Sequence, residues 1–180
     1  LNSGDSYTSP TIMAELVTEM LEFGDPDFVY GSSIEVDNVL CRKYHKVARS
    51  IKWIYYGMPA HHQAMLYKMS VITQRKIKYD IKYPTAGDYA FTINFISHCG
   101  QIMKTNLNIC FYSLGGISQT VYLKDLSEVK SIKHQELKMS WLFIHAISIV
   151  NKLFNQCKLH FPKLYVSIRY PFKKRTHDKL

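Results

Sequence analysis

The first regular pattern along the chain has the spacing of a helix. Apolar residues recur every three to four positions, at Ile12, Leu16, Met20 and Phe23. Residues with this spacing share one helical face, which predicts that this face is buried. Ser9 suits the N-cap, Pro10 suits the first helical position, and Gly24 suits the end of the helix. We therefore expect a helix between these residues.

The middle of the chain shows the alternation of β-strands. Residues 28–30 are a short apolar run, and residues 33–40 alternate apolar with acidic side chains, as an antiparallel strand does. Residues 41–57 are basic and aromatic, which indicates a loop or a partly extended arm. Residues 105–112 alternate again and predict a half-buried strand that ends at a glycine pair.

Helical patterns flank this last strand. Between Asp88 and Gly100 one helical face carries the apolar side chains of Phe91, Phe95, Ile96 and Cys99. Asp88 is then in the first turn of a buried helix, where its carboxylate is anchored. Residues 119–156 have a helical pattern that we expect to divide into two helices near residues 133–138. Strands and helices in one chain are typical of an α/β fold.

Length and composition fit one domain. The chain has 180 residues, of which 47% are hydrophobic and 13% aromatic, which supports a core and excludes general disorder. The longest apolar run, residues 141–150, is ten residues long, whereas crossing a bilayer takes roughly 20. No secretory signal is visible. The four cysteines are too widely spaced for a CxxC pair and too few for a disulfide scaffold. A reducing, cytoplasmic location is expected.

Charge is unevenly distributed. Residues 1–40 contain eight acidic residues and no Lys or Arg, residues 41–120 contain eleven basic and two acidic residues, and residues 121–180 contain twelve basic and four acidic residues. The net charge is +9. An acidic opening before a basic body is not the pattern of a uniformly basic nucleic-acid binder. It indicates a metal-attracting edge beside a pocket that receives an anion.

Five short motifs give the sequence a family likeness. In chain order they are LNSGD from residue 1, FVYG from residue 28, GMP from residue 57 with HQAM from residue 62, YPTAGDY from residue 83, and SLGGIS from residue 113. In this order they resemble the second half of family 2 glycosyltransferases, and most closely the bacterial enzymes of the colanic-acid and exopolysaccharide type. Each motif is short, and the shared order is more specific than any one of them.

The resemblance implies an α/β fold of the GT-A type, here an incomplete Rossmann-like glycosyltransferase fold. Residues 1–126 would form the acceptor-side part of the catalytic domain, with a mixed sheet, and residues 127–180 a C-terminal helical, basic region. The family's metal motif lies at the start, which makes Asp5 a ligand of Mg²⁺ or Mn²⁺. Such an ion bridges the phosphates of a nucleotide diphosphate and offsets the charge of the leaving group. From the residues alone, Asp5 is interpreted as an exposed turn residue or a helix cap.

The resemblance assigns the catalytic base to Asp88. This carboxylate would take the proton of the acceptor hydroxyl as it attacks the anomeric carbon, in a single displacement with inversion. Gly87 lets substrate approach the backbone, and the first helical turn holds the carboxylate rigid. The alternative from the residues alone is an N-cap aspartate.

The remaining assignments concern substrate contact. By resemblance, His62 and Gln63 lie between donor sugar and acceptor, and Gly115 and Gly116 belong to the mobile loop that closes over both. Adjacent His61 and His62 lack the i, i+4 spacing of a zinc site. The alternatives are a packed, hydrogen-bonded histidine and an ordinary glycine turn.

Two departures from the family pattern stand out. Ser32 follows Tyr30 and Gly31 at the position where the family usually carries an acid, so the role of that acid is open. The chain also opens on the metal motif without an initiator methionine. Since the nucleotide-binding half of the family precedes this motif, we expect a fragment that cannot build a complete donor site alone.

The C-terminal region suggests a partner of its own. Residues 137–180 combine nine basic residues and one acid with interspersed aromatic residues. This mixture suits the headgroups of an anionic membrane, where a lipid-linked acceptor would lie. A helix packed on the core, followed by a solvated basic tail, is the alternative. Single-stranded nucleic acid also binds such residues, but no nucleic-acid-binding signature accompanies them, and we expect no nucleic-acid partner.

Together these features predict a cytoplasmic glycosyltransferase fragment, peripheral at the inner face of the cell membrane. It would transfer a sugar from a nucleotide-diphosphate donor to a polysaccharide or lipid-linked acceptor, with inversion and with a divalent metal ion. The alternative is a catalytically incomplete remnant or a non-enzymatic binding module that retains the acceptor half. A nucleotide-binding half encoded upstream in frame would favour the enzyme.

Overall fold

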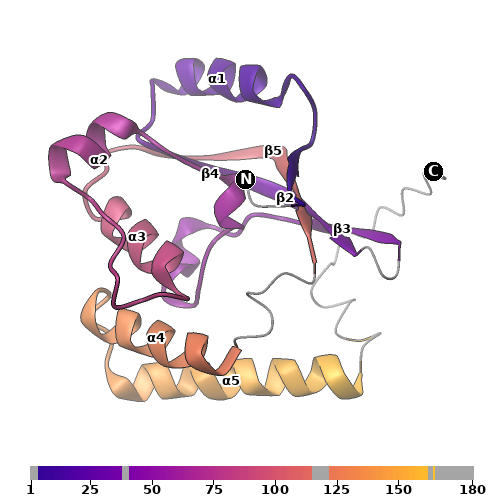
Figure 1. Ribbon diagram of the computed structural model, residues 1–180, viewed down its shortest axis with the longest axis vertical. Coiled ribbons are helices and arrows are strands. Elements are labelled where there is room, and N and C mark those ends of the chain that lie inside the picture. The colour runs from indigo at the N-terminus through magenta and orange to yellow at the C-terminus, as the bar shows by residue number, and fades with distance from the viewer. Residues whose placement is uncertain (1–3, 38–40, 115–121, 162–163, 165–180) are drawn as a thin grey trace.

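A mixed β-sheet lies between helices in the computed structural model, which describes residues 4–37, 41–114, 122–161 and 164 (Figure 1). The strands of this described part are β1 (Ser6–Tyr7), β2 (Phe28–Asp37), β3 (Arg42–Lys46), β4 (Met65–Tyr67) and β5 (Ile102–Ser113). Their order is β1-β5-β2-β3, and β4 also pairs with β2. β2 and β5 run parallel, whereas the other pairs are antiparallel. The predicted α/β class with a mixed sheet and C-terminal helices is confirmed.

The central strand β2 is one continuous strand. The prediction of two separate strands, at residues 28–30 and 33–40, was wrong because β2 runs unbroken from Phe28 to Asp37. Its register against β5 shifts between Tyr30 and Ser33. Such an irregularity lets a strand continue through a local break in pairing.

Gly31 lies at this irregularity, where β5 is packed closely against β2. A Cβ atom on Gly31 would lie 2.7 Å from Cγ2 of Thr105, 2.8 Å from Cδ1 of Ile109 and 2.9 Å from the carbonyl oxygen of Leu107. Because a backbone oxygen is among these neighbours, only glycine allows the two strands to approach this closely.

Alternate side chains of the sheet face two apolar clusters. Helix α1 (Ile12–Phe23) covers one face, and helices α2 (Met69–Arg75) and α3 (Gly87–Ile96) pack on the other (Figure 1). The α1 cluster comprises Ile12, Leu16, Val29, Ala64, Met103, Ile109 and Cys110. The α3 cluster comprises Phe28, Tyr30, Ala48, Ala60, Met65, Ile77, Phe91 and Phe95. The helical face predicted around Phe91 and Phe95 is therefore confirmed.

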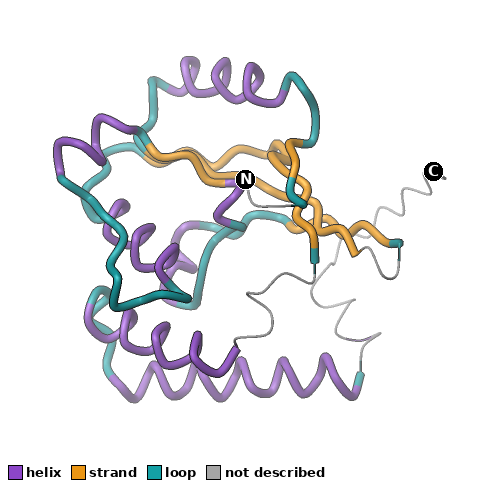
Figure 2. The backbone as a smooth tube through the Cα atoms, viewed as in Figure 1, coloured by secondary structure: helices purple, strands orange, loops and turns teal. Residues whose placement is uncertain are grey.

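Two further helices form an outer layer. α4 (Tyr122–Gln135) and α5 (Trp141–His160) lie side by side, with α4 next to α3 (Figures 1 and 2). The predicted division into two helices is confirmed, and Lys138 adopts a positive φ of 54° between them. α4 crosses the expected boundary between residues 126 and 127. Its Ile132 is fully buried in a cluster with Ile54, Tyr83, Ala86, Tyr89, Ala90 and Ile93, so residues beyond that boundary belong to the same core.

Two local predictions differ from the structure. Thr11 rather than Ser9 is the N-cap of α1, because the chain first makes a turn in which the carbonyl of Ser9 accepts the N–H of Ile12 at 3.4 Å. Residues 41–57, predicted as a loop or arm, contain β3 and the short 3-10 helix η1 (Ile51–Tyr55). β3 was missed because its side chains are mostly exposed and show no apolar alternation. Among the described residues, no helix combines the length and apolarity needed to cross a membrane.

Candidate active site

The short 3-10 helix η2 (His62–Ala64), directly before β4, contacts two carboxylates from distant parts of the chain. Nε2 of Gln63 donates to Oδ2 of Asp5 at 2.8 Å. Nδ1 of the adjacent His62 lies 3.3 Å from Oδ2 of Asp88. The four sequence-predicted site residues that the structure describes are thus joined by two contacts, Asp5 with Gln63 and His62 with Asp88, through the consecutive residues 62 and 63; we call these four residues the row. Gly115 and Gly116 lie outside the described residues.

Asp5 is fixed at the end of β5. Its Oδ1 accepts the backbone N–H of Ser113 at 3.1 Å, and the hydroxyl of Ser113 donates to the carbonyl of Gly4 at 2.9 Å. Gly4 has a positive φ of 87°, which lets the chain turn here. Asp5 is therefore neither a helix cap nor a residue of a fully exposed turn.

The donor set around Asp5 fits a metal ion that a phosphate group helps to hold. Each carboxylate oxygen of Asp5 accepts one of the bonds described above and, with respect to the described residues, retains a further lone pair. Within the described ranges, no cluster of three or more His, Cys, Asp or Glu residues could enclose an ion. Mg²⁺ is usually bound by one or two carboxylates together with substrate phosphates and water. The described residues around Asp5 therefore do not form a metal cage made of protein ligands alone.

Asp88 lies in the first turn of α3 but does not cap it. The N-cap is Ala86, and a glutamate of α4, Glu128, accepts the N–H groups of Thr85 and Ala86 at 3.0 and 2.8 Å. This geometry rules out the N-cap alternative for Asp88. The side chain of Asp88 is 42% exposed, and its Oδ2 faces His62.

Tyr79 is a second partner of Asp88 that the sequence reasoning missed. Its hydroxyl donates to Oδ1 of Asp88 at 3.0 Å, while its ring stacks on Phe91 at 4.6 Å. Burial, followed by the negative charge of Asp88, raises the pKa of Tyr79 to about 12. The phenol therefore stays protonated at neutral pH and remains a donor. Both carboxylate oxygens of Asp88 then have a side-chain partner.

A buried carboxylate holds η2 against the sheet. Oε1 of Glu35, 1% exposed, lies 3.0 Å from Nε2 of His61, whose ring stacks on Tyr112 at 4.1 Å. The sequence pattern had placed this acid on the polar side of its strand. The structure reverses that side because Glu35 has a partner inside the protein.

Two cations hold the turn that leads into η2. Nη2 of Arg49 donates to the carbonyl of Met58 at 2.6 Å, and Nζ of Lys133 donates to the carbonyl of Tyr56 at 2.9 Å. Lys133 is only 3% exposed, and burial, together with the charge of Arg49, lowers its pKa to about 8. The sequence gives no sign of this role, because a lysine in a helix normally faces solvent.

Ser32, which the sequence analysis singled out beside Tyr30 and Gly31, has a local structural contact. Its buried Oγ accepts the backbone N–H of Ala48 at 3.2 Å. This bond ties the segment after β3 back to the central strand.

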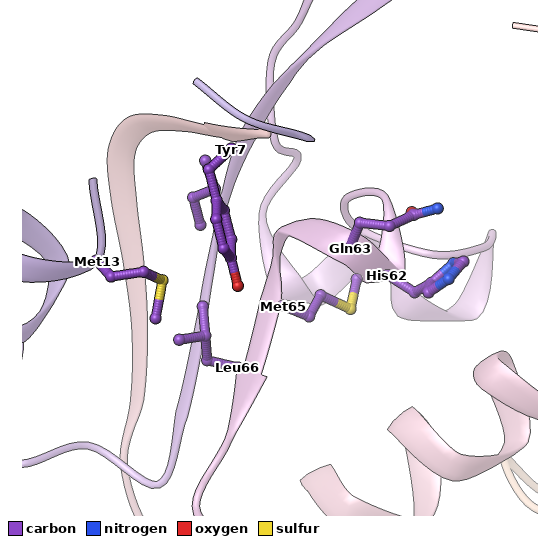
Figure 3. A pocket seen from close by; sticks show the side chains of 7 residues that line it. Tyr7, Met13, His62, Gln63, Met65 and Leu66 are labelled. Carbon is purple, nitrogen blue, oxygen red and sulfur yellow. The ribbon is translucent and has the colours of Figure 1, made fainter. Parts of the chain in front are cut away.

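A pocket of about 210 Å³ adjoins the row (Figure 3). Its lining comprises Tyr7, Met13, His62, Gln63, Met65, Leu66 and Ile109. His62 and Gln63 contribute both to this lining and to the contacts with Asp88 and Asp5. Oε1 of Gln63 is buried and accepts no hydrogen bond in the described part of the chain. A buried acceptor of this kind normally has water or a ligand nearby.

Comparison with known proteins adds a distant structural likeness. No protein-family model matches the chain, and no curated protein matches it significantly. The chain is similar to a crystal structure of Staphylococcus aureus TarS 1–349 in complex with UDP, with 11% identity and a TM-score of 0.49 over 94% of this chain and 49% of that one. A second crystal structure of S. aureus TarS 1–349 has 11% identity, the same coverages and a TM-score of 0.45. The chain thus spans about half the length of these structures, and likeness at this level identifies neither a family nor a substrate.

Proposed function

We propose that this chain is the acceptor-side part of a glycosyltransferase that moves a sugar from a nucleotide-diphosphate donor to an acceptor hydroxyl. The observation that carries the proposal is the row of Asp5 with Gln63 and His62 with Asp88. Two carboxylates from distant parts of the chain are each held by one of two consecutive residues. Such a pair suits a reaction in which charge develops on a leaving group while a proton leaves a nucleophile. The five ordered motifs support the same class.

Asp5 is the residue of this chain that would hold a divalent ion. When bound, Mg²⁺ or Mn²⁺ would supply positive charge against the departing diphosphate. Gln63 and the backbone N–H of Ser113 donate to the two oxygens of Asp5 and so fix the plane of the carboxylate. With one bond from the described residues to each oxygen, a second lone pair on each could bind an ion.

Asp88 is the residue proposed to accept the proton of the acceptor hydroxyl. The hydroxyl oxygen forms the new bond to the anomeric carbon, the bond from that carbon to the diphosphate breaks, and the diphosphate leaves with the electron pair. Attack from the side opposite the leaving group gives inversion. Tyr79 and His62 orient the carboxylate from two sides, and a positioned base of this kind contributes about 10²–10⁴-fold to a rate.

The exposed apolar side chains of α5 support a membrane surface as a further partner. Leu142, Phe143, Ile149 and Leu153 are between 61% and 80% exposed, whereas Ile144 is buried against the protein. Residues 141–160 include two lysines and no acidic residue. A helix with an exposed apolar face and only basic charges lies in the interface of an anionic membrane. We propose that α5 contacts such a surface at the inner face of the cell membrane.

The test is donor binding and transfer by the full-length protein. A panel of nucleotide sugars is first screened by thermal shift with and without Mn²⁺, and release of nucleoside diphosphate from the donors that bind is then measured with and without acceptors. The proposal expects at least one donor to raise the melting temperature only when metal is present. Failure of every donor in the panel to bind with metal would favour the alternative of a non-enzymatic binding module.

A further inference from the structure

We infer that the exposed face of the Tyr79 ring binds a sugar ring of the acceptor, so that the reacting hydroxyl belongs to a saccharide unit seated beside Asp88. This inference rests on the proposed function, because it names the substrate class at the same site. It states which part of the acceptor lies next to the proposed base, namely a sugar ring and not the phosphate of a lipid carrier.

Two contacts fix the plane of the Tyr79 ring. One face of the ring stacks on Phe91, with the ring centroids 4.6 Å apart and an angle of 15° between the planes. The hydroxyl donates to Oδ1 of Asp88 at 3.0 Å. Phe91 is buried and is held in turn by Tyr67, whose ring packs edge-on against it at 5.2 Å. The ring of Tyr79 is therefore oriented before any ligand arrives, which lowers the entropic cost of binding.

The opposite face of this ring is open. Tyr79 is 59% exposed although Phe91 covers one side of its ring, so the exposed surface lies on the other face and the edges. The backbone of Gly87 lies against one edge, where a Cβ atom would be 3.4 Å from Cδ1 of Tyr79. The ring thus lies against the first turn of α3 and presents a flat aromatic surface outward. Such a surface gains free energy when a second flat apolar surface covers it.

A pyranose ring suits both this surface and the neighbouring carboxylate. Its C–H bonds form an apolar face that can stack on an aromatic ring, whereas its hydroxyl groups project from the edge. With the C–H face on Tyr79, a hydroxyl at the edge comes within reach of Asp88, which binds Tyr79 and is 42% exposed. A phosphate group in the same place would instead be repelled by the negative charge of Asp88.

The nucleobase of the donor is the competing occupant, because bases also stack on aromatic side chains. Tyr79 binds Asp88, and Asp88 faces His62. The next residue, Gln63, binds Asp5. Tyr79 is thus at the end of this series of contacts opposite to Asp5, the residue proposed to hold the ion at the diphosphate. In a nucleotide sugar the base lies beyond the diphosphate, away from the reacting carbon, so the unit beside Asp88 is the one that carries the reacting hydroxyl.

Saturation-transfer difference NMR tests the inference without donor or transfer. Methyl β-D-glucoside, methyl β-D-galactoside and methyl α-D-mannoside are each titrated against the full-length protein, with uridine as the competing probe. We expect at least one glycoside to bind and the C–H protons on one face of its ring to receive saturation. Tyr79→Ala should weaken this binding at least tenfold because the stacking surface is lost. Tyr79→Phe, which keeps the ring, should retain it.

Tyr55→Ala is the matched control, because Tyr55 is a similarly exposed tyrosine, at 52%, on η1 and outside the row. If Tyr79→Ala fails to fold, Tyr79→Leu decides in its place, since leucine keeps an apolar contact with Phe91 but offers no flat face. Absence of binding by all three glycosides, an equal effect of Tyr79→Ala and Tyr55→Ala, or binding of uridine in place of a glycoside at Tyr79 would overturn the inference.

The same measurements separate this inference from the proposed function. Glycoside binding that is lost in Tyr79→Ala, without metal-dependent binding of any donor, would refute the proposed function and leave the stacking site in place. Metal-dependent donor binding, together with unchanged glycoside binding in Tyr79→Ala, would refute the stacking site and leave the proposed function in place.

Discussion

His62 and Asp88 meet at 3.3 Å between Nδ1 and Oδ2, although one belongs to η2 and the other to the first turn of α3. The neighbouring Gln63 binds Asp5 at 2.8 Å. Because separate side chains hold the two carboxylates, a substitution at one should leave the other in place. Donor binding and proton transfer can therefore be tested separately.

Replacement of Asp5 by Ala or Asn should abolish metal-dependent donor binding. Both variants remove the carboxylate charge that a divalent ion needs beside the diphosphate. Calorimetric titration of a nucleoside diphosphate in the presence of Mn²⁺ measures the effect on the full-length protein. Asp80→Ala is the control, since Asp80 pairs with Lys82 at 2.9 Å and has no part in the row. Equal affinity of wild type and Asp5→Ala would contradict the assignment.

Asp88→Asn should preserve folding and donor binding but lower the rate of transfer roughly 10²-fold or more. The asparagine oxygen can still accept the hydroxyl of Tyr79, so the local structure is retained. Turnover is measured at saturating donor, with Asp80→Asn in the neighbouring loop as the matched control. A wild-type rate in Asp88→Asn would show that this carboxylate is not the base.

Gly31→Ala should destabilise the protein by about 2–3 kcal/mol, the usual scale of overpacking in a core. The added methyl group would lie 2.9 Å from the carbonyl oxygen of Leu107, and the backbone cannot yield there without moving β5. Gly57→Ala is the matched control, because the nearest atom to its Cβ, Nη2 of Arg49, is 3.8 Å away. Urea denaturation compares the two. A loss at Gly31 no larger than at Gly57 would contradict the close approach of β2 and β5.

Lys133→Met should change how stability depends on pH. Burial, with the charge of Arg49, lowers the pKa of Lys133 from 10.5 to about 8, so the folded protein loses this proton at lower pH than the unfolded chain. Between these two values the unfolded state binds more protons, and this lysine makes the free energy of unfolding rise with pH. The advantage of wild type over Lys133→Met should thus grow by about 1–3 kcal/mol between pH 7 and pH 10.5.

Urea denaturation across this pH range measures that difference. Val129→Leu, on the same helix, removes no charge and serves as the control for packing. Parallel pH curves for wild type and Lys133→Met would show that Lys133 is not desolvated in the folded protein.

The double substitution Leu142→Ser and Leu153→Ser should weaken binding to anionic liposomes at least tenfold. Each leucine that enters the interface contributes roughly 1.5–3 kcal/mol of apolar burial, and both are largely exposed on α5. Flotation with phosphatidylglycerol vesicles measures binding. The double substitution of two exposed polar residues of the same helix, His145→Ser and Gln156→Ser, is the control.

A salt series distinguishes membrane from nucleic acid as the partner of the C-terminal region. Membrane binding should survive salt in part, because apolar burial is not screened. Oligonucleotide binding would instead fall log-linearly with salt concentration as counterions are released. A chain that ends at Lys138 should not float, and its flotation at the wild-type level would exclude α5 as the contact.

The hydrophobic periodicity of the sequence was enough by itself to predict α1, α3 and β5. The apolar face of α3, the alternation of β5 and the glycine end of α1 are local signals, and each element is present. The ordered motifs also singled out Asp5, His62, Gln63 and Asp88 as candidates. The roles of these residues remain predictions, and Gly115 and Gly116 lie outside the described residues.

Only the tertiary structure decided which of these residues meet. The contacts of Asp5 with Gln63 and of His62 with Asp88 join segments far apart in the chain, and no local pattern encodes such a distance. The burial of Glu35 and Lys133 was likewise decided only by the tertiary structure, because charged side chains normally lie at the surface. Both are buried because a partner from another element, His61 or the carbonyl of Tyr56, compensates the loss of water. A sequence shows how polar a residue is, but the partner that makes its burial possible exists only in the folded chain.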